Sequence, residues 1–289
     1  CALPIYHIGK ILFILVAMLV LTVGSYLFYI AKTTNVSDLQ DALKATTVIY
    51  DKEGNQAGSL SGQKGTYVEL DAISDSLENA VIATEDRTFY ENSGVNVKRF
   101  LLAIVSMGRF GGGSTITQQL AKNAFLTQEQ TVTRKAKEFF LSLELTKKYS
   151  KQEILTMYLN NAYFGNGVWG VEDASQKYFG TSAANLTVDE AATLAGMLKG
   201  PEIYNPIDNI QNATNRRNTV LANMVDDKKL SQADADSAAG VDMASRLDDT
   251  YQGTGDDYKY PSYFDAVIEE ATKTYGLSED EIVKNEIGR

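Results

Sequence analysis

Histidine and cysteine are almost absent from this sequence of 289 residues, which contains one histidine, His7, and one cysteine, Cys1. A serine–histidine–aspartate triad, a histidine-based metal site, a thiol nucleophile within the body of the chain and an internal disulfide are therefore excluded. Any chemistry in the body of the chain must use carboxylates, lysine and arginine, hydroxyls and amides.

Charged residues are also absent from residues 11–31, ILFILVAMLVLTVGSYLFYIA, which are mostly apolar. As a helix, this run would span about 31 Å, close to the thickness of the hydrocarbon core of a bilayer. A cleaved signal peptide is the alternative, but it would have a shorter apolar core and a small-x-small exit. The run therefore predicts a retained, single-pass transmembrane helix. We expect residues 1–10 to form a cytoplasmic stub and the body to lie on the external face.

The charge is negative overall and unevenly distributed. The formal net charge of −10 argues against general binding of nucleic acid. Residues 114–151 nevertheless contain seven basic and three acidic side chains, whereas residues 222–289 contain sixteen acidic and seven basic ones. A basic segment inside an acidic protein indicates a local anionic ligand. The alternative is a solvated helix face whose charges pair four residues apart.

The chain before residue 226 divides into a membrane-proximal part and a helical part. Residues 32–73 are predicted to form a stalk and two short strands joined by a turn. Residues 74–225 have helical periodicity. Capping boxes at residues 150–153 and 187–190, each with the pattern Ser/Thr-x-x-Glu, mark the beginnings of two of these helices.

The C-terminal part, residues 226–289, is rich in aspartate, alanine, serine and glycine. It is predicted to form a short helix, a loop and a last helix at about residues 262–275. The pattern continues to the last residue without an obvious end, so we expect the chain to be a fragment of a longer protein.

Three stretches could carry chemistry, and the first is ATEDRTFYENSG, residues 83–94. If this region forms a helix with an apolar stripe along one face, Glu85 lies one position beyond that stripe. A partly desolvated carboxylate of this kind suits a general base. The alternative is a helix end with surface acids, in which Arg87 is the partner of Glu85 and Asp86.

The second stretch is GRFGGGSTITQQLAKN, residues 108–123. Three glycines precede a helix that Ser114 or Thr115 caps, and a glycine loop that leads into a helix N-terminus is suited to anion binding. The pattern of a nucleotide-binding P-loop is absent. A flexible linker is the alternative. The helix carries an unusual density of donors: Gln118, Gln119, Lys122 and Asn123.

The third stretch covers residues 134–170. Arg134 and Glu138 are four residues apart on a helix, with Lys135 one position round, so Glu138 borders a packed face next to two cations. This carboxylate is a member of a structural salt bridge or the second half of an acid–base pair. The later part of the stretch alternates apolar residues with polar groups that suit sugar hydroxyls and diphosphate oxygens, among them Asn160.

Taken together, ATEDRTFYENSG, GGSTITQQLAKN, RKAKE and KQEILTMYLNNAYFGNGVWG resemble, in order and spacing, the peptidoglycan glycosyltransferase domain of class A penicillin-binding proteins. The resemblance covers roughly residues 75–225. It implies a mostly α-helical, lysozyme-like fold with two lobes, preceded by a membrane anchor. It also implies polymerisation of lipid II on the outer face of the bacterial membrane.

The resemblance implies that Glu85 is the general base and that Glu138 is the second carboxylate. Glu138 would position the reacting groups or assist the leaving diphosphate, directly or through a divalent cation such as magnesium or manganese. The implied partners are lipid II, the growing lipid-linked glycan chain, the membrane and other proteins of cell-wall synthesis or division. The implied substrate-binding residues are Asp86, Arg87, Phe89, Ser114, Thr115, Gln118, Gln119, Lys122, Asn123, Arg134, Lys135, Asn160 and Tyr163.

One position departs from the family pattern: Asn92 stands where members often have histidine three residues after the phenylalanine. Residues 32–73 and 226–289 resemble linker segments, the latter leading toward a transpeptidase domain that is absent from this chain. Two other functions remain open, a membrane-anchored muramidase or lytic transglycosylase and a non-catalytic scaffold. The basic segment argues against the first, since a hydrolase has no diphosphate to bind, and the two glutamates argue against the second.

Overall fold

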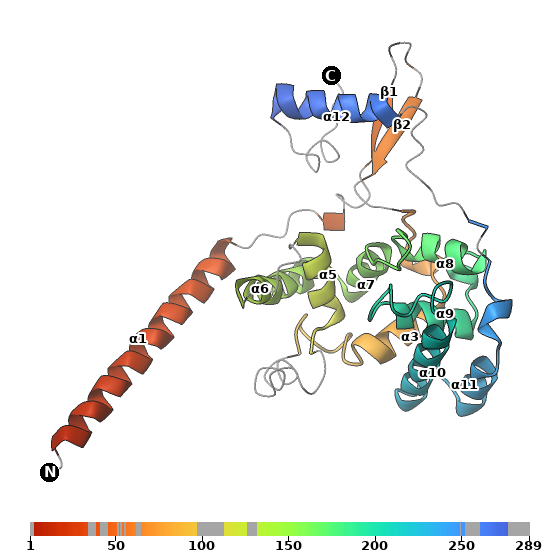
Figure 1. The fold of residues 1–289 in the computed structure, drawn as a ribbon. Helices are drawn as coiled ribbons and strands as arrows, with labels where there is room; N and C mark the ends of the chain where they lie inside the picture. The colour runs from red at the N-terminus through yellow and green to blue at the C-terminus, as the bar shows by residue number, and fades with distance from the viewer. Residues whose placement is uncertain are drawn as a thin grey trace.

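The computed structural model describes residues 3–33, 39–40, 46–50, 52, 54, 56–61, 65–96, 113–125, 132–248, 250–251 and 261–276. Figure 1 shows a body of packed helices from which α1 extends, with a β-hairpin and α12 lying above the body. The helices are α1 (Leu3–Thr33), α3 (Asp75–Glu85), α5 (Ile116–Phe125), α6 (Val132–Lys148), α7 (Lys151–Asn160), α8 (Val171–Phe179), α9 (Val188–Met197), α10 (Ile210–Asp226), α11 (Gln232–Ala239) and α12 (Pro261–Tyr275). The mostly helical architecture predicted from the sequence is confirmed; its division into two lobes stays a prediction.

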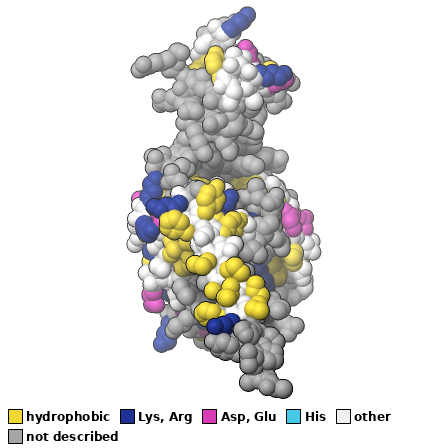
Figure 2. Space-filling model, turned by 90° about the vertical axis from the view of Figure 1, so that its left-hand side faces the viewer, with side chains coloured by type: hydrophobic (Ala, Val, Ile, Leu, Met, Phe, Trp, Pro, Cys, Tyr) yellow, Lys and Arg dark blue, Asp and Glu magenta, His cyan; other side chains and the backbone are white. Residues whose placement is uncertain are grey.

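Helix α1 covers the predicted apolar run as one continuous helix. Large apolar side chains on it are exposed, including Phe13 at 75% and Leu21 at 70%. Figure 2, which views the molecule from the side of α1, shows hydrophobic side chains gathered on this face. The helix contacts α6, where the hydroxyls of Tyr26 and Thr133 lie 2.8 Å apart. Among the residues described, no helix meets the length and hydropathy of a membrane span.

The predicted pair of short strands is confirmed. Strand β1 (Thr46–Tyr50) pairs antiparallel with β2 (Gln56–Ser61), and the register shifts once near the turn. Gly54, in the connecting turn, has φ of 82°, a conformation that glycine adopts without a steric penalty. In Figure 1 the hairpin lies beside α12 and away from the helical body.

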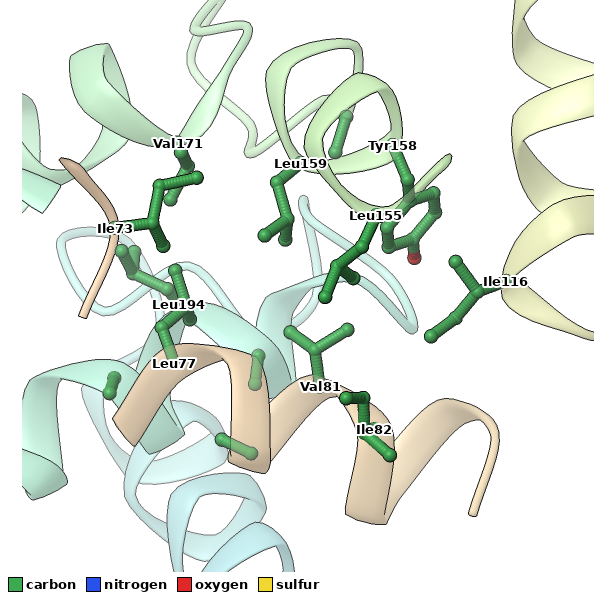
Figure 3. Packing of buried hydrophobic residues seen from close by; sticks show 14 of the residues in the cluster. Ile73, Leu77, Val81, Ile82, Ile116, Leu155, Tyr158, Leu159, Val171 and Leu194 are labelled. Atoms are coloured by element: carbon green, nitrogen blue, oxygen red, sulfur yellow. The ribbon is translucent and has the colours of Figure 1, made fainter. Parts of the chain in front are cut away.

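The core of the body forms where α3, α5, α7 and α9 meet (Figure 3). Apolar side chains spaced three or four residues apart put one stripe of each helix inside. Val81 of α3 points toward Leu155 of α7, Leu77 of α3 lies beside Leu194 of α9, and Ile116 of α5 lies next to Tyr158. Each of these side chains is at most 2% exposed. This packing fixes the ends of α3, α5 and α7 relative to one another.

The capping boxes that were predicted at the beginnings of α7 and α9 are both present. The Ser150 hydroxyl accepts from the Glu153 amide while the Glu153 carboxylate accepts from the Ser150 amide, which pairs two amides that a helix start leaves free. Three short 3-10 turns, η1 (Leu70–Ala72), η2 (Ala183–Asn185) and η3 (Met243–Ser245), connect the longer elements.

The packed body continues past residue 225. Ala235 and Ala238 of α11 lie in the core, and α11 packs on α9 and α10. Arg217 of α10, 1% exposed, donates to the backbone carbonyls of Ala239 at 2.7 Å and Val241 at 2.8 Å, and so caps the end of α11. The predicted short helix and last helix of the C-terminal part are confirmed as α11 and α12. The sequence also predicts an apolar helix at residues 96–108, NVKRFLLAIVSMG, but this segment lies almost wholly outside the described residues.

Candidate active site

Helix α3 carries Glu85 as its last residue. The helix begins after Ser74, whose hydroxyl accepts from the Leu77 amide at 3.3 Å, and it buries Leu77, Ala80 and Val81. Asp86 ends the helix with φ of −156° and ψ of 80°. The carboxylate of Glu85 is therefore placed where a rigid, buried helix reaches its end.

The carboxylate of Glu85 is held from two sides. The amide nitrogen of Gln119 on α5 donates to its Oε2 atom at 2.8 Å, and a guanidinium nitrogen of Arg216 on α10 lies 3.9 Å from its Oε1 atom. The side chain is 15% exposed. This arrangement orients the carboxylate and keeps part of its surface accessible.

Tyr158 of α7 fixes the orientation of the Gln119 amide. Its buried hydroxyl donates to Gln119 Oε1 at 3.0 Å, so the amino group of the amide faces Glu85. Burial, and next the charge of Glu85, raise the pKa of the Tyr158 phenol well above its ordinary value. The phenol thus remains a donor at every pH at which the protein would work.

Arg216 is a residue that the sequence analysis missed. Its Nε atom donates to the backbone carbonyl of Gly196 at 3.2 Å, and its guanidinium lies 5.7 Å from the centre of the Tyr204 ring. The adjacent pair Arg216–Arg217 was visible in the sequence. The sequence did not show which of the two faces Glu85 and which caps α11, because this depends on how α10 packs.

Glu138 of α6 is 2% exposed and is paired with two cations of its own helix. Arg134 lies 3.7 Å from one of its oxygens, and the ammonium of Lys135 donates to the other. The same ammonium donates to the hydroxyl of Ser114 at 2.9 Å, which joins α6 to the segment before α5. The predicted contact of Glu138 with both cations is therefore present, and its charge is already compensated within the protein.

The start of α5 is held by a reciprocal pair of hydrogen bonds. The Thr115 amide donates to Gln118 Oε1 at 3.0 Å, and the Gln118 amide donates to the Thr115 hydroxyl at 3.1 Å. Both side chains are at most 2% exposed. Of the two predicted caps, Thr115 is the one that the structure uses. Both residues stabilise the helix that presents Gln119.

Lys122 and Asn123 follow on the same helix. Lys122 lies one turn beyond Gln118 and Gln119, since residues three and four apart share a helix face. It is half-buried, Asn123 is exposed, and within the described part of the chain neither has a hydrogen-bond or ion-pair partner. Lys122 is thus available to an anion beside the glutamines.

Five other predicted substrate contacts have partners within the protein. Asp86 and Phe89 are at most 1% exposed. Arg87 donates to the Ala83 carbonyl at 3.0 Å and to Asn223 at 3.2 Å, and it lines a surface cavity of about 470 Å³ beside α10. The fully buried Asn160 exchanges hydrogen bonds with the backbone of Val68. Tyr163 donates to Glu202 at 2.6 Å and stacks on Trp169.

The residues around Glu138 do not fit a divalent cation. The carboxylate of Glu138 lies against two positive groups, which would repel a metal ion. No cluster of three or more histidine, cysteine, aspartate or glutamate side chains with metal-binding geometry occurs among the residues described.

The chain is similar to known proteins over most of its length. A family with the description "Transglycosylase" matches residues 53–225. Penicillin-binding protein 2a of Streptococcus pneumoniae serotype 2 (strain D39 / NCTC 7466) is 65% identical over 280 residues, which are 97% of this chain and 38% of that protein. Penicillin-binding protein 1A/1B of Bacillus subtilis (strain 168) is 42% identical over 224 residues, which are 74% of this chain and 24% of that protein.

A crystal structure of penicillin-binding protein 1A from Haemophilus influenzae aligns over 82% of this chain and 26% of that one, with a TM-score of 0.42 and 23% identity. That likeness is too distant to support an argument. The chain spans less than half the length of the curated relatives described above. On the family match and the identities, the chain belongs to the transglycosylase family and contains the peptidoglycan glycosyltransferase domain of a class A penicillin-binding protein.

Proposed function

We propose that this protein polymerises lipid II into glycan strands, with Glu85 as the general base. The observation that carries the proposal is the setting of Glu85: a carboxylate at a helix end, oriented by Gln119, flanked by Arg216 and 15% exposed. Such a group accepts a proton from a bound hydroxyl without first having to reorganise.

In the proposed reaction, the substrates are two lipid-linked sugars. Glu85 takes the proton from the 4-hydroxyl of the N-acetylglucosamine of the acceptor, and that oxygen forms a bond to the anomeric carbon of the donor chain. The bond between the anomeric carbon and the diphosphate breaks, and its electrons leave with undecaprenyl diphosphate. The configuration at the anomeric carbon is inverted, since the oxygen attacks opposite the leaving group.

The diphosphate would bind near the cations of α5 and α6. Lys135 reaches from Glu138 to Ser114, and its side chain is 38% exposed, so its ammonium can approach a ligand. Lys122 lies on α5 beyond the two glutamines and has no partner within the described residues. We assign Lys122, Arg134 and Lys135 to the diphosphate, and we assign Glu138 to holding the last two in place.

Glu138 thus has a different role from Glu85 in this proposal. A carboxylate repels a diphosphate, so a direct contact between Glu138 and the leaving group would be unfavourable. Because Glu138 is paired with two cations, it lowers the repulsion between them. Both cations can then lie close to each other and to the diphosphate. Five of the predicted contacts are buried and would support this site from inside the protein: Asp86, Phe89, Thr115, Gln118 and Asn160.

We further propose that α1 anchors the protein in the bacterial membrane as a single span, with the catalytic body on the external face. The uncharged run at residues 11–31 and the exposed apolar side chains of α1 support this arrangement. A body held at the membrane surface suits a substrate that is itself held there by a lipid. The growing glycan chain and other proteins of cell-wall synthesis are the expected partners.

The test is incubation of the purified chain, kept in detergent, with lipid II. The parent protein should produce glycan polymer and release undecaprenyl diphosphate. Glu85→Gln, which keeps the shape of the side chain and removes its basicity, should lower the rate by a factor of about 1,000 or more. Glu91→Gln, an exposed position six residues further on, is the matched control and should retain the parental rate.

Two results would contradict the proposal. One is absence of polymer from the folded parent protein. The other is cleavage of preformed glycan strands, which would place the protein among the muramidases or lytic transglycosylases. A Glu85→Gln variant as active as the Glu91→Gln control would remove Glu85 from the proposed role and leave the class of reaction standing.

A further inference from the structure

Asp86, the residue after the proposed base, is a buried carboxylate that no cation contacts directly within the described part of the chain. It is 1% exposed. Its oxygens accept from the Asn92 amide at 3.1 and 2.9 Å, from the Thr88 hydroxyl at 3.1 Å and from the backbone amide of Ile116 at 3.3 Å. A buried carboxylate with neutral donors alone is costly unless a positive charge lies close by.

That positive charge is Lys151, the first residue of α7, and Asn92 lies between it and Asp86. The ammonium of Lys151 donates to Asn92 Oδ1 at 3.1 Å and lies 4.7 Å from the centre of the Phe89 ring. Burial lowers the pKa of Lys151, and the charge of Asp86 opposes this shift. The Asn92 amide thus presents its donor end to the carboxylate and its acceptor end to the ammonium.

The same amide holds the start of α5 by two routes. In the first, Asp86 accepts the amide of Ile116, the first residue of α5. In the second, Asn92 Oδ1 accepts from the Gly94 amide at 2.9 Å, and the Gly94 carbonyl accepts from the Thr115 hydroxyl at 2.6 Å. Both routes end at the turn of α5 that leads directly to Gln119.

Gly94 allows no substitution in this connection. Its φ of +92° suits glycine, and a Cβ atom there would lie 2.4 Å from the Ser142 carbonyl of α6. The turn that contains Asn92 is therefore packed closely against α6, and it has little room in which to shift.

We propose that Asn92 and Lys151 are positioning residues for the base Glu85. They fix the position of Asp86 relative to the start of α5. In this way they keep the Gln119 amide within hydrogen-bond distance of the Glu85 carboxylate. Asparagine suits this position because one uncharged side chain satisfies a carboxylate and an ammonium at the same time. The inference rests on the proposed role of Glu85.

The test compares Asn92→Leu, Lys151→Met and two controls on the exposed surface of the same body, Asn185→Leu and Lys229→Met. Asn92→Leu should lower kcat for lipid II polymerisation by about ten- to a hundredfold with little change in KM, because substrate binding is not affected while the base is misplaced. Lys151→Met leaves the contact between Asn92 and Asp86 in place, so its effect should be smaller, about three- to tenfold. The controls should match the parent.

A double-mutant cycle separates positioning from general loss of stability. If Asn92 acts through Gln119, Gln119→Ala should lower kcat by a comparable factor, and Asn92→Leu should cause little further loss when Gln119 is already alanine. A variant that only unfolds more easily would lower kcat by the same factor in either background.

Amide hydrogen exchange supplies a readout that does not depend on activity. In Asn92→Leu the Ile116 amide should exchange at least tenfold faster than in the parent, while Tyr158 and its neighbours in α7 keep their protection. Parental exchange at Ile116 together with a parental kcat in both variants would overturn the inference. Faster exchange in a chain that polymerises no lipid II would instead count against the proposed function.

Discussion

Glu85 and Glu138 are the same type of residue, yet the helices that carry them give them opposite surroundings. Glu85 ends α3, is 15% exposed and has one neutral donor at 2.8 Å and one cation at 3.9 Å. Glu138 lies in the second turn of α6, is 2% exposed and contacts two cations of its own helix. The first carboxylate keeps an accessible surface, whereas the second is enclosed by its two cations.

This difference follows from where each residue lies along its helix. At the end of α3 the chain turns away, which leaves the carboxylate to partners from α5 and α10. Within α6, residues three and four positions away lie on the same face and can pair at once. In the proposed mechanism, two glutamates that would be indistinguishable by composition therefore take the roles of proton acceptor and charge partner. The three predictions below test that division, in order of decreasing effect.

Glu138→Gln should have the largest of these effects. Removing the charge leaves Arg134 and Lys135 beside each other without a counter-charge at a position that is 2% exposed. Breaking a buried ion pair on one side costs about 3 kcal/mol or more of folding stability. Because the two cations would also shift away from the diphosphate, kcat/KM should fall about a hundredfold. Polymerisation kinetics and thermal unfolding, measured on the same preparation, check this expectation.

Glu144→Gln is the matched control for that variant. Glu144 lies on the same helix and pairs with Lys147, but both side chains are exposed, at 44% and 70%. Exposed pairs contribute little, so the rate should change by less than about twofold. Equal effects of the two substitutions would show that Glu138 has no special role.

Lys122→Ala should weaken binding of a diphosphate-containing substrate by about tenfold, since one charge-assisted contact to the diphosphate is lost. Lys137→Ala removes a charge from the same basic segment at an exposed position and should change affinity by less than twofold. Titration with lipid II under conditions that prevent turnover measures both. Unchanged affinity in Lys122→Ala would remove this residue from the proposed diphosphate site.

The smallest effects are expected at the two arginines near Glu85, and they should differ. Arg216→Met removes the cation that lies 3.9 Å from the carboxylate and should lower kcat about fivefold. Arg87→Met should change kcat less than twofold, because its guanidinium is bonded to Ala83 and Asn223 on the side of α10. A larger loss of kcat in Arg87→Met than in Arg216→Met would instead support the sequence-based assignment of Arg87 to substrate binding.

The sequence predicted the local features of the fold well. The capping boxes at Ser150 and Thr187, the hairpin and the last helix depend on residues close in the chain, so their patterns are readable without the structure. The pairing of Arg134 and Lys135 with Glu138 was readable for the same reason, since all three lie within two turns of one helix.

The features that the sequence did not predict depend on tertiary packing. Arg216 and Tyr158 come to the Glu85 site from α10 and α7, and nothing in their local patterns distinguishes them from ordinary helix residues. Asn160 was assigned to the substrate because amides suit sugars. The same donor and acceptor groups equally suit a backbone amide and carbonyl, and those of Val68 are the partners that Asn160 has.

The most direct test of the account is the configuration of the bond that the enzyme makes. A base that activates an incoming hydroxyl leads to inversion in one step, whereas a carboxylate that attacks the sugar forms a covalent intermediate and leads to retention. The anomeric configuration of the newly made linkage can be measured by NMR on product from lipid II and compared with that of the donor. The account predicts inversion, with one undecaprenyl diphosphate released for each bond formed. Retention would contradict the assignment of Glu85 as the base.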